Sequence, residues 1–181
     1  RAKWNWFHMA SIMCIIIMEA EQSTIGDIWK EEEDKMQIDM DTVLKEDISE
    51  EIRELEDYSR IKFPQSYVEF IKKYNVGVPL TKCLPFDNNI FVVERFLGFV
   101  KDYQESDLGW YDIGVVLSQL FDRLTDKPNR VGDDIIPIAV LFAGNFVCLD
   151  FRNETAAEPE VCIWYHEESE EFAPVTRKVA D

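Results

Sequence analysis

The sequence is poor in the residues and motifs that most enzymes use for catalysis. Its 181 residues include only two histidines, His8 and His166, and only seven glycines. There is no P-loop, no dinucleotide-binding fingerprint, no G-x-S-x-G nucleophile motif and no H-E-x-x-H zinc motif. The four cysteines form neither a C-x-x-C pair nor a zinc-ligand spacing. We therefore predict no catalytic residue, no metal site and no cofactor.

Basic residues are also scarce. The chain has 19 Lys and Arg residues against 36 Asp and Glu residues, which gives a formal net charge of -17. Such a surface repels nucleic acid and anionic membranes, because affinity for phosphate groups comes from Lys and Arg. The same charge attracts a basic protein and speeds its encounter, although acidity can also serve solubility alone. We expect a protein partner, no nucleic acid and no membrane.

The low hydrophobicity that accompanies high charge in disordered chains is missing here. Apolar residues make up 46% of the sequence and aromatic residues 13%, which is enough to build the core of one domain. Cys148 and Cys162 lie within apolar runs, where cysteine behaves as a small hydrophobic residue. This cysteine usage indicates a reduced, cytoplasmic protein.

The first part of the chain differs from the rest. Residues 4–18 form an apolar run after two basic residues, as in a signal peptide. The run is too short to span a bilayer, and no A-x-A cleavage site follows it. We interpret residues 1–20 as a non-native or loosely ordered extension, with export as the alternative. Residues 21–46 are interpreted as an acidic, partly helical lead-in, and residues 47–181 as the folded domain.

Three segments have the apolar spacing of amphipathic helices, namely residues 47–60, 63–75 and 112–124. Pro64 suits the first turn of the second helix, and Asp112 is a natural N-cap for the third. The positions predicted to face the core are Ile48, Ile52, Leu55, Tyr58, Tyr67, Phe70, Ile71, Tyr74, Ile113, Val116, Leu117, Leu120, Phe121 and Leu124.

Strand-like segments fill most of the remaining chain. Residues 78–100 are rich in β-branched and aromatic residues, with Gly98 as a predicted bulge. Three further strands are predicted at residues 135–143, 146–152 and 161–167. The Gly-Asn pair between the first two predicts a two-residue hairpin turn. A phosphate-binding loop would need more glycines and a following helix.

A two-residue turn fixes the register of this hairpin, pairing Leu141 with Cys148 and Ala139 with Asp150. Asp150 and Arg152 then share a mixed face and are within reach of each other, so we interpret Asp150 as structural. Its alternative is an acid or base in an enzyme, together with His166. The opposite face is predicted to point into the core and consists of Ile136, Ile138, Val140, Phe142, Val147, Leu149 and Phe151.

Three sequence blocks, in this order, resemble the SUKH superfamily. FPQSYVEFIKKYN (63–75) is similar to its L-P-x-x-Y-x-x-F-L-x-x-Y-N-G helix, although Val76 intervenes where the family reads Asn-Gly. IIPIAVLFAGNFVCLDFR (135–152) is similar to its I-P-I-A…G-N-x-x-x-L-D strand pair. PEVCIWYHEESEEF (159–172) is similar to its P-x-V-x-x-W-x-H-E strand. The family's last helix, A-x-S-F-x-E-F-L, has no counterpart, so we expect a domain truncated before it.

The resemblance implies an α+β fold in a single domain. Its sheet would be mostly antiparallel, with about five or six strands flanked by helices, and would carry no catalytic residues. The superfamily includes bacterial immunity proteins that neutralise polymorphic toxins, and the yeast cell-wall assembly regulator family. We expect an immunity protein that blocks a cognate toxin, basic and nuclease-like. The alternatives are a regulatory or scaffold module and an enzyme that uses Asp150 and His166.

A toxin-binding surface is expected to combine acidic residues with aromatic ones. Tyr and Trp concentrate binding energy at interfaces, whereas charge sets the rate of association. For each single residue the alternative is a place in the core or a solvated surface position. The predicted partner-binding residues are Trp110, Tyr111, Asp150, Trp164, His166, Glu167, Glu168, Glu170 and Glu171.

Overall fold

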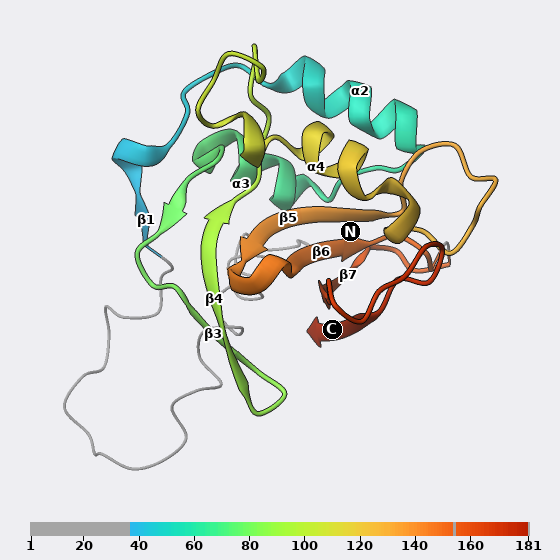
Figure 1. The fold of residues 1–181 in the computed structure, drawn as a ribbon. Helices are drawn as coiled ribbons and strands as arrows, with labels where there is room; N and C mark the ends of the chain where they lie inside the picture. Colours follow the sequence, from blue (N-terminus) through green and yellow to red (C-terminus); the bar gives the residue numbers. More distant parts are fainter. Residues whose placement is uncertain (1–36, 154, 181) are drawn as a thin grey trace, which may run out of the picture.

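The computed structural model describes residues 37–153 and 155–180, and its architecture is α+β. The described residues form three α-helices, which lie together on one side of strands β5 and β6 (Figure 1). They are α2 (Ser49–Ser59), α3 (Gln65–Tyr74) and α4 (Ile113–Leu120). The predicted fold class is therefore confirmed. The predicted extension at residues 1–20 and the first part of the lead-in lie outside the described residues.

The main sheet is an antiparallel meander in which each strand pairs with the next one along the chain. A second sheet of two short strands joins β1 (Ile38–Asp39) to β2 (Val78–Pro79). A 3-10 turn, η2 (Met40–Thr42), follows β1. The six strands of the main sheet are β3 (Cys83–Phe86), β4 (Asn89–Phe96), β5 (Ile135–Leu141), β6 (Phe146–Asp150), β7 (Glu160–Trp164) and β8 (Thr176–Ala180).

Helix α3 begins and ends close to the predicted positions. Pro64 is its N-cap and Asn75 its C-cap, and the left-handed residue that follows is Val76 rather than a glycine. Phe63 packs on Tyr67 with the ring centroids 5.0 Å apart, as predicted for a residue that folds back on the helix. Phe70 makes an edge contact with Phe96 of β4 at 5.0 Å, which fixes the helix to the sheet.

Two aromatic residues predicted to lie in the core are exposed instead. Tyr58 in the last turn of α2 is 61% exposed and Phe121 is 58% exposed. Helix α4 ends at Leu120 and a 3-10 turn, η4 (Phe121–Arg123), takes over. This turn has fewer residues per turn than an α-helix, so the side chains rotate away from the predicted stripe. Leu124 completes the stripe and is fully buried.

The hairpin of β5 and β6 exists, but its predicted register is wrong. Cys148 pairs with Pro137 and Asp150 pairs with Ile135, with an irregularity between Pro137 and Ala139. The connection is the longer 3-10 turn η5 (Phe142–Gly144), which contains left-handed Ala143 and Gly144. It is closed by a 2.9 Å bond from the Leu141 amide to the Asn145 carbonyl. Phe142 consequently lies outside the core.

The sequence predicted one buried face for the β5–β6 hairpin, but both faces of β6 are buried. Val147 and Leu149 are buried on one face, and Cys148 and Asp150 on the other. Phe63 contacts Phe151 on the first face at 6.0 Å. On the second face, the Arg123 guanidinium lies 5.3 Å from the Trp164 ring centroid. The sheet is therefore a central layer rather than a wall with one solvated side.

Cys148 and Cys162 face each other across β6 and β7, and both are buried, reduced thiols. They pack as small hydrophobic residues, as predicted. Burial raises the pKa of the Cys148 thiol well above its ordinary value. Within residues 37–153 and 155–180, no helix has the length and apolar character needed to cross a membrane.

Candidate functional site

Five of the predicted partner-binding residues, His166 and four glutamates, lie on the segment between β7 and β8, which we call the acidic loop (residues 166–171). The backbone of this loop places Glu167, Glu168, Glu170 and Glu171 at the surface. The Glu167 side chain is 89% exposed, whereas Glu168 is partly engaged by Arg177 at 3.5 Å. No described residue forms an ion pair with Glu170 or Glu171. The loop therefore presents uncompensated negative charge to solvent.

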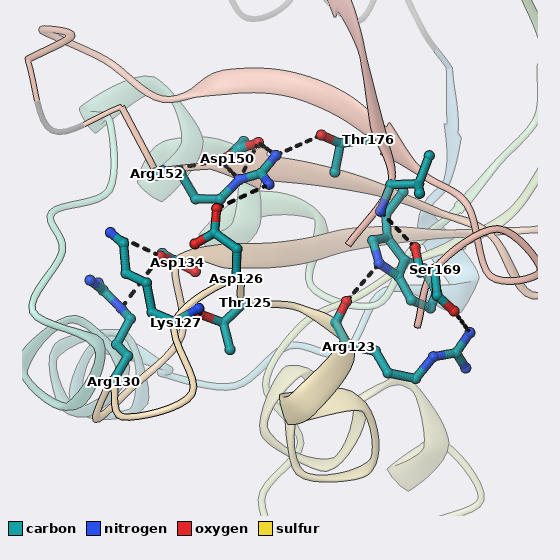
Figure 2. Close-up of polar contacts among 12 residues, drawn as sticks. Arg123, Thr125, Asp126, Lys127, Arg130, Asp134, Asp150, Arg152, Ser169 and Thr176 are labelled. Atoms are coloured by element: carbon teal, nitrogen blue, oxygen red, sulfur yellow. Dashed lines mark hydrogen bonds and ion pairs between the residues drawn. The ribbon is translucent and has the colours of Figure 1, made fainter. Parts of the chain in front are cut away.

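A single arginine fastens this loop to the end of α4. Figure 2 shows Arg123 reaching Ser169, whose carbonyl accepts a 2.7 Å hydrogen bond from Nη2. The same nitrogen donates to the His166 carbonyl. In return, the Trp164 indole donates to the backbone carbonyl of Arg123 at 3.0 Å. Charge-assisted hydrogen bonds to carbonyl groups are strong, so the backbone of the acidic loop is held in one conformation.

His166 joins the acidic loop to the turn η5. Its amide donates to Asn145 Oδ1 at 2.9 Å, and its ring Nδ1 lies 3.2 Å from Arg123 Nη1. A guanidinium can only donate, so Nδ1 is the acceptor in this contact. Phe142 of η5 is 67% exposed. An exposed aromatic residue thus lies on the turn to which the acidic loop is hydrogen-bonded.

Two other predicted residues are buried and have structural roles. Trp164 is fully buried, with its ring 5.9 Å from Phe146. Asp150 is only 9% exposed and accepts hydrogen bonds from the Arg152 amide at 3.0 Å and from its guanidinium at 2.5 to 3.1 Å. Figure 2 shows Arg152 also reaching Thr176 of β8, at 2.7 Å. The prediction that Asp150 and Arg152 reach each other is confirmed.

The remaining aromatic pair lies at the opposite end of α4 from Arg123. Trp110 and Tyr111 belong to η3 (Gly109–Tyr111), immediately before the N-cap Asp112. Trp110 is the more exposed at 73%, whereas Tyr111 lies under the Arg95 guanidinium at 4.9 Å. Eight helical residues separate the two sites by roughly 12 Å along the helix axis. The structure therefore does not join Trp110 directly to the acidic loop.

A groove that no sequence pattern indicated adjoins the acidic loop. It lies between α2, α4 and the loop of residues 125–133, and its volume is about 360 Å³. Phe172, the residue after the acidic loop, lines it and donates from its amide to the Asp122 carbonyl at 2.6 Å. The exposed rings of Tyr58 and Phe121 also line it. Their apolar spacing indicated burial, which is why sequence reasoning missed the groove.

Two adjacent buried aspartates lie at the end of the 125–133 loop. Asp134 is fully buried between Lys127 and Arg130, each at 3.6 Å from its Oδ2, and Figure 2 shows both cations pointing at it. Burial raises the pKa of Asp134, and the two cations oppose this shift. Asp133 lines the groove and is 8% exposed. Burial, helped by Asp134, raises the pKa of Asp133 to about 6.

The described residues contain no group of three or more His, Cys, Asp and Glu side chains arranged to hold a metal ion. The side-chain contacts of His166 are with Arg123, Glu167 and Trp164. The arrangement is therefore suited to recognition of another molecule through charge, exposed aromatic rings and a groove.

A protein-family model matches most of the described chain. The model of the SMI1-KNR4 cell-wall family (SUKH_6) matches residues 49–180. The match begins at the first residue of α2 and continues into β8, so it includes the acidic loop and the groove. No curated protein and no solved structure matches the chain.

Proposed function

Because the chain belongs to the SMI1-KNR4 cell-wall family of the SUKH superfamily, we propose that it is a non-enzymatic immunity protein that binds and neutralises a cognate toxin domain. The toxin is a basic, nuclease-like protein, and the complex forms in the cytoplasm. The observation that carries this proposal is the acidic loop, which is exposed in its side chains and fixed in its backbone by Arg123. Blocking is both steric and electrostatic.

The physical basis is that the loop is already in place before the partner arrives. Glu167, Glu170 and Glu171 attract a basic cleft over a long range, which raises the rate of association. A loop that is held by hydrogen bonds loses little conformational freedom on binding, so more of the interaction energy appears as affinity. Phe142 on the neighbouring turn supplies an aromatic contact of the kind that anchors interfaces.

The experiment is a capture from source-cell lysate with the tagged chain, at low and high salt. The test variant carries Glu167→Gln, Glu170→Gln and Glu171→Gln. The matched control carries Glu54→Gln, Glu94→Gln and Glu105→Gln, which remove the same charge at exposed positions on α2, β4 and the loop before η3. We expect wild type and control to retain one basic polypeptide that the test variant releases at moderate salt.

A growth assay then distinguishes immunity from other kinds of binding. Expression of the captured polypeptide alone should stop growth, and co-expression of this chain should restore it. Capture of several housekeeping or cell-envelope proteins, with no growth arrest by any of them, would contradict the proposal. That result would favour the second candidate, a regulatory or scaffold module similar to the cell-wall assembly regulators of the same family.

A further inference from the structure

The groove beside the acidic loop combines apolar walls with one carboxylate. Its volume of about 360 Å³ falls in the range of pockets that take a small ligand or a large side chain. Leu55 and Tyr58 line it from α2, Leu117 from α4 and Phe121 from η4. The rings of Tyr58 and Phe121 are more than half exposed, so the groove is open to a partner.

The carboxylate is that of Asp133, and nothing in the described chain satisfies it. The Asp133 amide donates a hydrogen bond to Ser59 Oγ at 3.3 Å, which involves the backbone and not the carboxylate. No described residue donates a hydrogen bond to its carboxylate or forms an ion pair with it. The residue is 8% exposed and its oxygens are not completely shielded from solvent, so the charge is only partly hydrated. Partial loss of hydration without an ionic partner is unfavourable. A cation bound in the groove would remove this cost.

The cations that line the groove are engaged elsewhere. Lys127 and Arg130 both contact the neighbouring carboxylate of Asp134 at 3.6 Å. Arg130 lowers the pKa of Asp133 somewhat, but burial and Asp134 outweigh it, and the pKa remains raised to about 6. At neutral pH the groove therefore contains a negative charge whose stabilisation is incomplete.

We infer that this groove receives an arginine side chain of the protein partner, whose guanidinium pairs with Asp133 while its stem lies between Tyr58 and Phe121. Arginine fits better than lysine because its planar head pairs with a carboxylate through two hydrogen bonds and stacks on aromatic rings. The inference rests on the proposed function, since a basic partner supplies such a residue. Phe172 lines the groove directly after Glu171, so the groove and the acidic loop form one continuous surface.

The test uses N-acetyl-arginine amide as the probe and N-acetyl-norleucine amide as its uncharged counterpart. Each is titrated into the isotopically labelled 181-residue chain while the amide NMR signals of Gly114, Ser118 and Gly132 are followed. The same titrations are made on Asp133→Asn and on the control Asp107→Asn, which changes an exposed aspartate in another loop. Asparagine keeps the size of the side chain at both positions.

We expect the arginine probe to shift these signals saturably in wild type and in Asp107→Asn. In Asp133→Asn its affinity should fall about tenfold or more, because a charged hydrogen-bonded pair is lost. Equal shifts with the norleucine probe, equal shifts in Asp133→Asn, or no shift at millimolar probe would each overturn the inference. The growth assay tests the proposed function separately. Probe binding without growth protection would support the arginine-binding groove and contradict the immunity function. Growth protection without probe binding would support the immunity function and contradict the arginine-binding groove.

Discussion

The guanidinium of Arg152 and the carboxylate of Asp150 form a paired contact at the end of β6, with Nε 2.9 Å from Oδ1 and Nη2 2.5 Å from Oδ2. The pair is mostly buried, since the two side chains are only 24% and 11% exposed. This contact ties the end of β6 to β8, because the same nitrogen of Arg152 donates to Thr176.

We expect Asp150→Asn to destabilise the fold by about 3 kcal/mol, because it leaves the Arg152 charge buried without its partner. Urea unfolding measures the change. The control is Asp126→Asn, which removes a half-exposed carboxylate 3.9 Å from the same arginine and should cost at most about 1 kcal/mol. If Asp150→Asn were as stable as wild type but lost an enzymatic activity, the structural interpretation of Asp150 would be wrong.

The raised pKa of Asp133 predicts a pH-dependent stability difference. The pKa of this group is about 6 in the folded chain, against an ordinary aspartate pKa of 3.8, so the folded state holds the proton more tightly than the unfolded state. Stability from this group is therefore present below about pH 4 and is lost as the pH rises to about 6. Asp134 strengthens the shift and Arg130 weakens it.

Asp133→Asn removes this ionisation and should stabilise the chain by about 2–3 kcal/mol at pH 7 and above, with little difference below pH 4. The measurement compares free energies of unfolding of variant and wild type over this pH range. Taking the difference cancels the titration of the other carboxylates. A difference that is constant with pH would show that Asp133 does not ionise as the structure implies. A stable variant also means that lost probe binding cannot be attributed to unfolding.

Gly132 lies where the 125–133 loop packs so closely against α2 that there is no room for a side chain. Its φ is +83°, and a Cβ there would clash with the Tyr58 carbonyl and come within 2.5 Å of the Ser59 Cα. Gly144 has a similar φ of +78°, but a Cβ would meet only His166 atoms at 3.6 Å or more. Both substitutions to alanine carry left-handed strain of about 1 kcal/mol.

We therefore expect Gly132→Ala to be more destabilising than Gly144→Ala by at least about 1–2 kcal/mol, since only the former overpacks the end of α2. Thermal unfolding of the two variants side by side isolates the steric part, because the backbone strain is shared. Equal losses in the two variants would mean that the 125–133 loop moves freely away from α2. The groove would then not be a fixed feature of the fold.

Local patterns in the sequence predicted the elements but not how each one ends. Asp112 caps α4 through its carboxylate, which accepts from the Val115 amide at 3.0 Å, and this follows directly from residue type and position. The exposure of Phe121 does not follow from the local sequence. It results from the change to a 3-10 turn, which places Leu124 in the core and Arg123 against the acidic loop. Strand β8 was missed because its alternation is short and is stabilised by pairing with β7.

Some features of the candidate site could likewise be predicted from the sequence, and others could not. Exposed glutamates in the acidic loop could be read from the run of charges alone, since so many acids cannot all be buried. The burial of Trp164 could not be predicted from local sequence, because its indole is hydrogen-bonded to Arg123, which lies 41 positions earlier in the chain. The groove depends on three segments that are distant in sequence. It also depends on a carboxylate without a partner, which no local pattern indicates.

Arg123 holds the acidic loop through backbone carbonyl groups, which every amino acid possesses. The fastening is therefore indifferent to which side chains the loop displays at positions 167, 168, 170 and 171. Exchange of those side chains would alter the charge and shape of the surface while leaving the loop's path and the core beneath it unchanged. A scaffold built in this way can change its surface by a few substitutions in the loop without losing the contacts that stabilise the fold.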